Sequence, residues 1–282
     1  MRFTCRGTAS RRQLLFTAAG AGLGAAACLC CPPPPPALAS EWGYDCASGP
    51  STWSGSCTAG GAQSPIAVPL PPAGAAAPPP GALRPRYPRR LAGATCVNNG
   101  HGSPEIIAPP GTAFCEIDGA RYELVQVHFH CTAEHSLGGG ARAPMEAHLV
   151  HRAATPDGGG GLVVLAVTLR LGAANPVLQA ALDAAPAAPG GVVPLPRGVS
   201  LQALLPPPHG AGQHRPYATY RGSLTTPPCS EGVRWFVFTE PRTVSAQQVL
   251  QFQQFGGGGG GALGRNARPQ QPLNGRAVQY FS

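Results

Sequence analysis

The segment "LVQVHFHCTAEH", residues Leu124–His135, places three histidines and a glutamate among apolar residues. Its first part alternates between apolar and polar residues, which is typical of a half-buried strand. Side chains two positions apart on a strand share a face, so His128 and His130 point one way and Val127 and Phe129 the other. The segment therefore predicts a strand with one face in a core and imidazoles on the opposite face.

Other short apolar runs extend this pattern along the chain. Strands are predicted over residues 121–131, 146–153, 161–171 and 231–241, and helices over 176–183 and 245–255. In the second helix Ser245 is the expected N-cap and Gly256 the expected stop. Segment 40–65 is expected to be irregular, and the proline-rich segment 69–90 to cross the surface outside the central sheet. The run Gly256–Gly261 has no predicted function. The chain is thus predicted to form one predominantly β domain with a few short helices.

The first 39 residues are expected to form a cleavable targeting leader, followed by one domain over residues 40–282. Arg11 and Arg12 precede a Gly- and Ala-rich stretch, and the small residues at 37–39 suit a cleavage site. The paired arginines resemble a twin-arginine export signal, although an ordinary secretory signal fits the same residues. The apolar stretch is at the short limit for a membrane span, so no anchor is expected after the leader is removed.

The composition argues against nucleic-acid binding. The chain of 282 residues has a net charge of +8, and all 20 basic residues are arginine. These arginines are scattered, set among prolines or confined to the expected leader, without a basic stripe that interleaves with aromatic residues. The hydrophobic share of 43% is enough for a sizeable core. No sequence feature assigns an oligomeric state.

Six cysteines follow the leader, and none forms a CxxC pair, which argues against a zinc-ribbon or redox motif. An even number in an exported protein permits disulfides, but six cysteines allow 15 pairings. The six are Cys46, Cys57, Cys96, Cys115, Cys131 and Cys229.

A third histidine completes a candidate metal site. His148 lies 18 residues after His130, and the loop at residues 136–144 can lay its strand beside the first. Three imidazoles with one open position are the pattern of catalytic zinc. Gln126 beside His128, and Glu146 beside His148, can hold the second ring nitrogens. The HxH pattern also occurs in cupins and copper sites, so these residues alone predict a metal site and leave the metal open.

Motifs throughout the chain resemble those of the α-class carbonic anhydrases. The resemblance implies that family's fold, a single domain around a large twisted, mostly antiparallel central sheet with short peripheral helices. It also implies zinc-dependent, reversible hydration of carbon dioxide to bicarbonate and a proton, by zinc-bound hydroxide. The motifs are "WGY" (42–44), "QSPI" (63–66), "NNGH" (98–101), "QVHFH" (126–130), "AEHS" (133–136), "EAHLVH" (146–151), "YRGSLTTPPCSEGVRW" (220–235) and "RPQQPLNGR" (268–276).

The resemblance assigns a role to several residues. The zinc ligands would be His128, His130 and His148. Thr225 would accept a hydrogen bond from the zinc-bound hydroxide and donate one from its own hydroxyl to Glu134, which stays ionised, and Thr226 would contact bicarbonate. The apolar wall that holds carbon dioxide would be Val150, Val164, Leu224 and Trp235, of which the two valines also suit plain core packing.

His101 would shuttle protons to buffer, because an imidazole titrates near neutral pH. Tyr44, Asn98 and Asn99 would order the water chain that leads to it. His135 would be structural, and Cys57 and Cys229 would form the disulfide found in exported members of the family.

The sequence departs from the family pattern at Cys131, where tryptophan is common. Some family members that lost a zinc ligand are binding proteins without activity, and this is the alternative function for the present chain, although it keeps all three histidines. The lysine-free, Ala/Gly/Pro-rich style favours the thylakoid lumen of an algal chloroplast over the periplasm or secretion. The twin-arginine leader fits the lumen and the periplasm alike, and its short length argues against a chloroplast. The expected partners are carbon dioxide, bicarbonate and a proton buffer.

Overall fold

The computed structural model describes residues 42–71, 83–154, 161–210, 214–257 and 265–281. The chain divides into two compact units, Met1–Glu41 and Trp42–Ser282. The expected leader over residues 1–39 lies outside the described residues, as do most of the glycine run and part of the proline-rich segment. The division into leader and domain therefore stays a prediction. Within the described part of the chain, no helix has the length and apolarity needed to cross a membrane.

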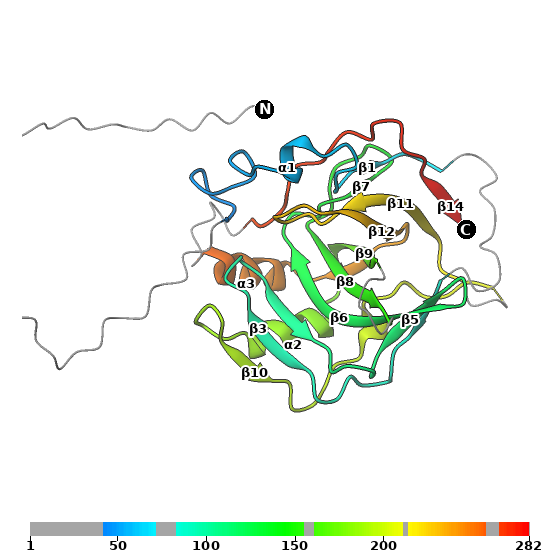
Figure 1. The fold of residues 1–282 in the computed structure, drawn as a ribbon. Helices are drawn as coiled ribbons and strands as arrows, with labels where there is room; N and C mark the ends of the chain where they lie inside the picture. The colour runs from blue at the N-terminus through cyan, green and yellow to red at the C-terminus, as the bar shows by residue number, and fades with distance from the viewer. Residues whose placement is uncertain (1–41, 72–82, 155–160, 211–213, 258–264, 282) are drawn as a thin grey trace, which may run out of the picture. The chain divides into compact units, whose positions relative to one another are not determined.

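A 12-stranded sheet dominates the unit Trp42–Ser282, which confirms the predicted fold class (Figure 1). Its main path runs β10 (Val192–Pro194), β3 (Thr95–Asn98), β4 (Pro104–Ile107), β6 (Ala120–His130), β8 (Met145–Ala153), β9 (Leu162–Leu171), β12 (Glu231–Phe238), β11 (Tyr217–Ser223) and β14 (Gln279–Phe281). Off this path, β13 (Arg242–Val244) pairs with β9, and β5 (Phe114–Ile117) joins β2 (Arg84–Arg86) to β6. Most pairings are antiparallel; β12 and β13 run parallel to β9.

Short elements complete the unit. They are β1 (Ala67–Val68), which pairs with β7 (Ser136–Leu137), the helices α1 (Ser56–Ala59), α2 (Pro176–Ala184) and α3 (Ala246–Gly257), and the 3₁₀ turn η1 (Leu201–Ala203). Ser245 caps α3 as predicted, because its hydroxyl accepts from Gln248 N while Gln248 Oε1 accepts from Ser245 N.

Three local predictions need correction. α3 continues through Gly256 to Gly257, since glycine lowers helix propensity by only about 1 kcal/mol and does not enforce a stop. The proline-rich segment contributes β2, which is compatible with Pro85 because β2 lies at an edge of the sheet. The run 231–241 ends as a strand at Phe238, and the chain resumes pairing only after Pro241, in β13.

The alternation of β6 is interrupted by a bulge that the sequence did not predict. Leu124 pairs with His151 and Gln126 with Val150, so Val125 is an extra residue without a partner in that ladder. The bulge reverses the parity of the strand. Leu124 therefore joins Val127 and Phe129 in the core, although simple alternation from Gln126 would place it on the opposite face.

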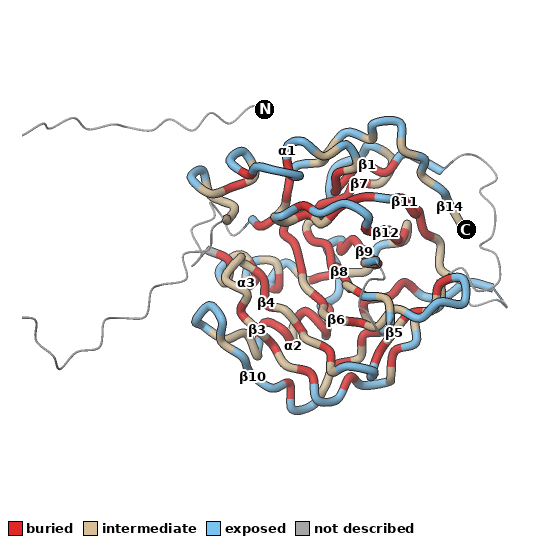
Figure 2. The backbone as a smooth tube through the Cα atoms, in the orientation of Figure 1, coloured by how far each residue is buried: buried red, intermediate tan, exposed pale blue. Residues whose placement is uncertain are grey.

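The sheet has an apolar cluster on each face, and its central strands are the most deeply buried (Figure 2). The larger cluster includes Val127 and Phe129 of β6 and is covered by α2 and α3, which contribute Leu178 and Phe252. The smaller cluster contains Val164 and Trp235. Residues of β9 enter both clusters alternately, as expected for a strand buried on both faces.

His151 lies fully buried on β8, on the side of the larger cluster. Its Nε2 is 2.9 Å from the hydroxyl of Tyr87, and its Nδ1 has no partner with good geometry among the described residues. Burial lowers the pKa of His151 to about 4. The folded protein therefore favours the neutral imidazole.

His151 is expected to make stability depend on pH. Between about pH 6.5 and pH 4 the unfolded chain binds a proton at this histidine that the folded chain does not bind. The free energy of unfolding should fall by about 3 kcal/mol as pH drops through this window, at about 1.4 kcal/mol per pKa unit. Urea unfolding of wild type and His151→Gln, both metal-free, at pH 7 and pH 4 measures the difference. Equal pH dependence of the two proteins would contradict the assignment.

Candidate metal centre

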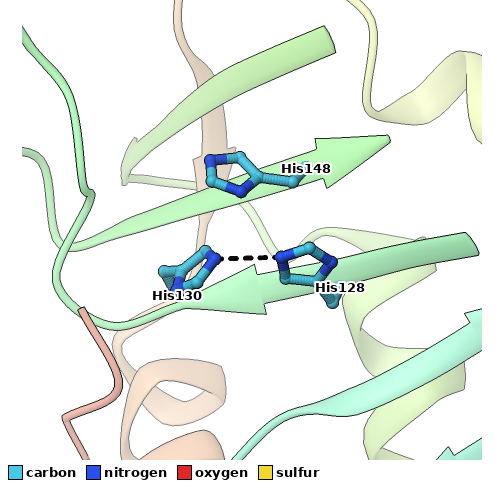
Figure 3. A group of neighbouring side chains, drawn as sticks. All are labelled: His128, His130 and His148. Atoms are coloured by element: carbon cyan, nitrogen blue, oxygen red, sulfur yellow. Dashed lines mark hydrogen bonds between the residues drawn. The ribbon is translucent and has the colours of Figure 1, made fainter. Parts of the chain in front are cut away.

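The antiparallel pairing of β6 and β8 brings the three predicted ligands together. His128 and His148 are direct partners in the register, and His130 lies two residues along β6 on the same face. Figure 3 shows the three imidazoles converging between the two strands. Nε2 of His128 lies 3.0 Å from Nε2 of His130, and the ligand atoms of all three residues lie within 4.8 Å of one another.

Each imidazole has its second ring nitrogen held by an oxygen acceptor. Nδ1 of His128 is 2.7 Å from Gln126 Oε1, and Nε2 of His148 is 2.8 Å from Glu146 Oε1. Both contacts agree with the sequence-based expectation. Nδ1 of His130 donates to the backbone carbonyl of Asn266 at 2.7 Å. The nitrogens left to face the centre are therefore Nε2 of His128, Nε2 of His130 and Nδ1 of His148.

The electrostatics of the site keep these imidazoles neutral. Burial, followed by repulsion from the other two histidines, lowers the pKa of His128 well below its usual value. Burial lowers the pKa of His130 to about 4 and also lowers that of His148. Neutral imidazole is the form that binds metal ions.

The donor set fits zinc. Three neutral imidazole nitrogens with fixed tautomers are a catalytic zinc arrangement, in which Zn–N distances of about 2.0–2.1 Å set ligand nitrogens roughly 3.3 Å apart. The 3.0 Å between Nε2 of His128 and Nε2 of His130 is close to that spacing. Cys131, the thiol nearest in sequence, packs in the larger core cluster behind β6 and does not join the set.

Gln126→Leu is expected to weaken zinc binding by about 10- to 100-fold, because it removes the acceptor that fixes the tautomer of His128. Zinc affinity can be measured by competition with a chromophoric chelator. Gln126→Glu keeps an acceptor and is the matched control. Unchanged affinity in Gln126→Leu would show that this contact does not support the ligand.

A second imidazole–carboxylate cluster lies behind His148. Nδ1 of His135 is 2.7 Å from Glu146 Oε1, and Nε2 of His135 is 2.7 Å from the hydroxyl of Tyr220. Burial would raise the pKa of Glu146, but His135 and His148 hold it well below its usual value. Both nitrogens of His135 are thus engaged, in agreement with its expected structural role, and Glu146 is a shared anionic acceptor.

Glu134 is fully buried beside the three histidines. Its Oε1 accepts from the backbone N–H of Arg268 at 2.8 Å, and its Oε2 lies 3.5 Å from Nε2 of His130. Burial raises the pKa of Glu134 to about 7, and a hydrogen bond from the Thr225 side chain is among the effects that oppose this rise. Oε2 nevertheless has no partner of standard geometry among the described residues.

A cavity of about 140 Å³ opens in front of the histidines. The residues that line it come from several elements and include two of the three candidate ligands. They are Trp42, Tyr44, Asn99, His101, Ser103, Glu105, Gln126, His128, His130, Thr226 and Asn266. Four residues that the resemblance assigned to the site thus line one cavity: Tyr44, Asn99, His101 and Thr226. Asn98 instead donates from its amide to the carbonyls of Pro186 and Ala187.

His101 is half-buried and stacks on Trp42, with ring centroids 3.6 Å apart and planes at 6°. Burial lowers the pKa of its imidazole, while a hydrogen bond to the Trp42 backbone opposes the shift. Nδ1 of His101 has no partner with good geometry among the described residues. His101 is therefore held against Trp42 while it lines the same cavity as His128 and His130.

The four predicted wall residues lie in one apolar cluster, the smaller cluster of the sheet. Val164 and Trp235 are buried in it, and Val150 and Leu224 pack against it. The indole of Trp235 lies 4.9 Å from the ring of His148. An apolar cluster therefore adjoins the candidate metal centre on the side of β8 and β12.

The expected disulfide between Cys57 and Cys229 is present. It joins α1 to the segment that carries Thr225 and Thr226. Cys96, Cys115 and Cys131 are buried free thiols, and Cys46 is exposed.

Sequence reasoning missed Asn266, which makes four hydrogen bonds to residues at the end of β6. Its carbonyl accepts from His130, its Oδ1 from Cys131 N, and its Nδ2 donates to Phe129 O. Its backbone N–H donates to Cys131 O. A backbone carbonyl carries no residue-type signal, and Asn266 lies outside the quoted motifs, so the sequence did not indicate this contact.

The motifs and the geometry agree with a comparison against known families. A family model for eukaryotic-type carbonic anhydrase matches residues 48–282. The chain belongs to this family. The resemblance and the enzyme class predicted from the sequence, carbonic anhydrase, are both confirmed by this match and by the relatives.

Relatives of this carbonic anhydrase cover most of the chain. It is 33% identical over 249 residues to a carbonic anhydrase of Pectobacterium atrosepticum, covering 84% of this chain and 90% of the relative. A structure of a Chlamydomonas reinhardtii carbonic anhydrase with acetazolamide is 40% identical, with a TM-score of 0.73, covering 85% of this chain and 98% of that one. The α-carbonic anhydrase of Thermovibrio ammonificans with sulfanilamide is 36% identical, with a TM-score of 0.70 and coverages of 84% and 98%.

Proposed function

We propose that this carbonic anhydrase binds one zinc ion on His128, His130 and His148 and uses it to hydrate carbon dioxide reversibly to bicarbonate and a proton. The convergence of three neutral imidazoles, each with its second nitrogen held, carries this proposal. Zinc bound in this way lowers the pKa of a bound water to about 7, which makes a nucleophile available at neutral pH.

Thr225 and Glu134 would orient the attacking water. The hydroxyl of Thr225 would donate a hydrogen bond to Glu134, so its lone pairs are left to accept a hydrogen bond from the water. Burial raises the pKa of Glu134 to about 7. A dication on the three histidines would lower this pKa and so favour the ionised form of Glu134. This direction of hydrogen bonds favours ligands that carry a proton to donate.

The smaller apolar cluster would bind carbon dioxide, and residues of the polar cavity would contact bicarbonate and transfer the proton. Val150, Val164, Leu224 and Trp235 offer carbon dioxide a surface without a strong polar contact, and Thr226 would contact bicarbonate. His101 would carry the released proton from the cavity to buffer.

His101→Ala is expected to slow turnover by about tenfold or more in weak buffer, because general acid–base groups contribute at this scale or above. The rate should recover in part when imidazole is added. Stopped-flow measurement of carbon dioxide hydration with a pH indicator tests this. Equal rates for wild type and variant in both buffers would remove His101 from the proton path.

The alternative function, a binding protein without activity on the same fold, makes a different prediction for the purified domain. Residues 40–282 loaded with one zinc per chain should hydrate carbon dioxide well above the rate of buffer alone. A rate equal to buffer at full zinc occupancy would support the binding protein. Metal analysis of the purified chain would separate zinc from copper.

The leader and the disulfide support export. Stable disulfides form in oxidising compartments, and residues 1–39 have the order of a targeting leader. The thylakoid lumen is the destination we favour, with the periplasm and secretion as alternatives. Imaging of the full-length chain with a C-terminal tag would distinguish them.

A further inference from the structure

Glu105 is an acidic side chain in the cavity to which the proposed reaction assigns no role. It lies on β4, beside β3, and lines the same cavity as His101 and His128. Among the described residues it makes no ion pair. The side chain of Ile106 packs in the larger core cluster, and the hydroxyl of Ser103 accepts a hydrogen bond from the backbone N–H of Phe129.

One hydrogen bond connects this carboxylate to the turn that carries His101. Nδ2 of Asn99 donates to Oε1 of Glu105 at 2.9 Å. Oδ1 of the same Asn99 accepts from the backbone N–H of His101 at 2.8 Å. Glu105 therefore orients the side-chain amide of Asn99 through its NH₂ group. The oxygen of the same amide holds the backbone N–H of His101.

The two hydrogen bonds fix which way the side-chain amide of Asn99 faces. A carboxylate only accepts hydrogen bonds, so it selects the orientation of Asn99 in which the NH₂ group faces Glu105. That orientation turns Oδ1 toward the backbone N–H of His101. Burial raises the pKa of the Glu105 carboxyl, and the bond from Asn99 opposes this rise by favouring the ionised form.

We propose that Glu105 is a positioning residue for proton transfer, which acts through Asn99 to hold the turn and imidazole of His101 at the cavity. The proposal rests on the proposed function, in which His101 carries the proton. Glu105 itself need not contact the substrate. Its loss should slow the proton-transfer part of turnover and leave the encounter with carbon dioxide unchanged.

The test compares zinc-loaded wild type with Glu105→Ala, Glu105→Gln, Asn99→Ala and the double alanine variant. In weak buffer, Glu105→Ala should lower kcat by about three- to tenfold. This is less than the roughly 100-fold that a 1 Å misplacement of a reacting group can cost, because Glu105 acts on His101 only through Asn99. Its kcat/KM for carbon dioxide should stay within about twofold. Glu105→Gln retains an acceptor oxygen and should recover most of kcat. The double variant should lose no more than Asn99→Ala alone, since the two residues act as one unit.

A second readout does not depend on activity. The amide hydrogen of His101 should exchange with solvent faster in Glu105→Ala than in wild type or Glu105→Gln, by NMR on the zinc-loaded protein. Unchanged kcat and unchanged exchange in Glu105→Ala would overturn the proposal. Equal loss of kcat and kcat/KM would also overturn it, because it would show a general structural role.

His101→Ala in the same buffers separates this proposal from the one on which it rests. If His101→Ala slows turnover and Glu105→Ala does not, the shuttle stands and the positioning role fails. If His101→Ala has no effect while wild type remains active, the shuttle assignment itself fails.

Discussion

Replacing His148 with alanine is expected to abolish zinc binding and carbon dioxide hydration together. The substitution removes one of three imidazoles whose ligand atoms lie within 4.8 Å of one another, and it leaves Glu146 without one of its donors. Two histidines are fewer than the three protein ligands of catalytic zinc sites. Zinc content by mass spectrometry and hydration rate by stopped flow, on the same preparation, measure both effects.

The control for this variant is His209→Ala, which removes an exposed histidine that pairs with Glu240 on the surface. It should keep both zinc and activity. Circular dichroism of the two variants shows whether the fold is retained. Stoichiometric zinc in a folded His148→Ala protein would contradict the assignment of this ligand.

Thr225→Val is expected to lower the hydration rate by about 100-fold or more while zinc stays bound. The substitution keeps the shape of a buried side chain but removes the hydroxyl that we propose connects the attacking water to Glu134. Loss of one oriented hydrogen-bonding group at a reacting centre costs roughly 100- to 1,000-fold in kcat. The readouts are kcat at saturating buffer and zinc content.

Thr225→Ser restores a hydroxyl at the same position and should recover most of the rate. A second comparison, Glu134→Gln, keeps the shape of the acceptor and removes its charge, and it should resemble Thr225→Val. Full activity in Thr225→Val would show that the hydrogen-bond chain does not contribute to the reaction.

The sequence predicted the main strands and the convergence of three histidines because both depend on side-chain patterns. Alternation along β6 indicated the shared face of His128 and His130, and the 18-residue spacing allowed a return strand that carries His148. The near-continuous apolar run of β9 indicated burial on both faces, which its entry into both clusters confirms. The disulfide between Cys57 and Cys229 came from the family resemblance, since the residues alone allowed many pairings.

Features that depend on the backbone could not be predicted in this way. The bulge at Val125 reverses the parity of β6, and no residue in "ELVQV" marks it. The acceptor for His130 is the carbonyl of Asn266, a group that every residue possesses. The contact between Glu105 and Asn99 depends on the pairing of β3 with β4, which the short runs near residue 100 did not indicate.

The central claim is that one zinc ion on His128, His130 and His148 makes this chain an active carbonic anhydrase. The most direct measurement is the hydration rate of metal-free domain 40–282 during stepwise addition of zinc. Activity should rise linearly and reach its plateau at one zinc per chain, and His148→Ala should stay at the rate of buffer throughout. Activity that is independent of added zinc, or a fully occupied site with no activity, would contradict it.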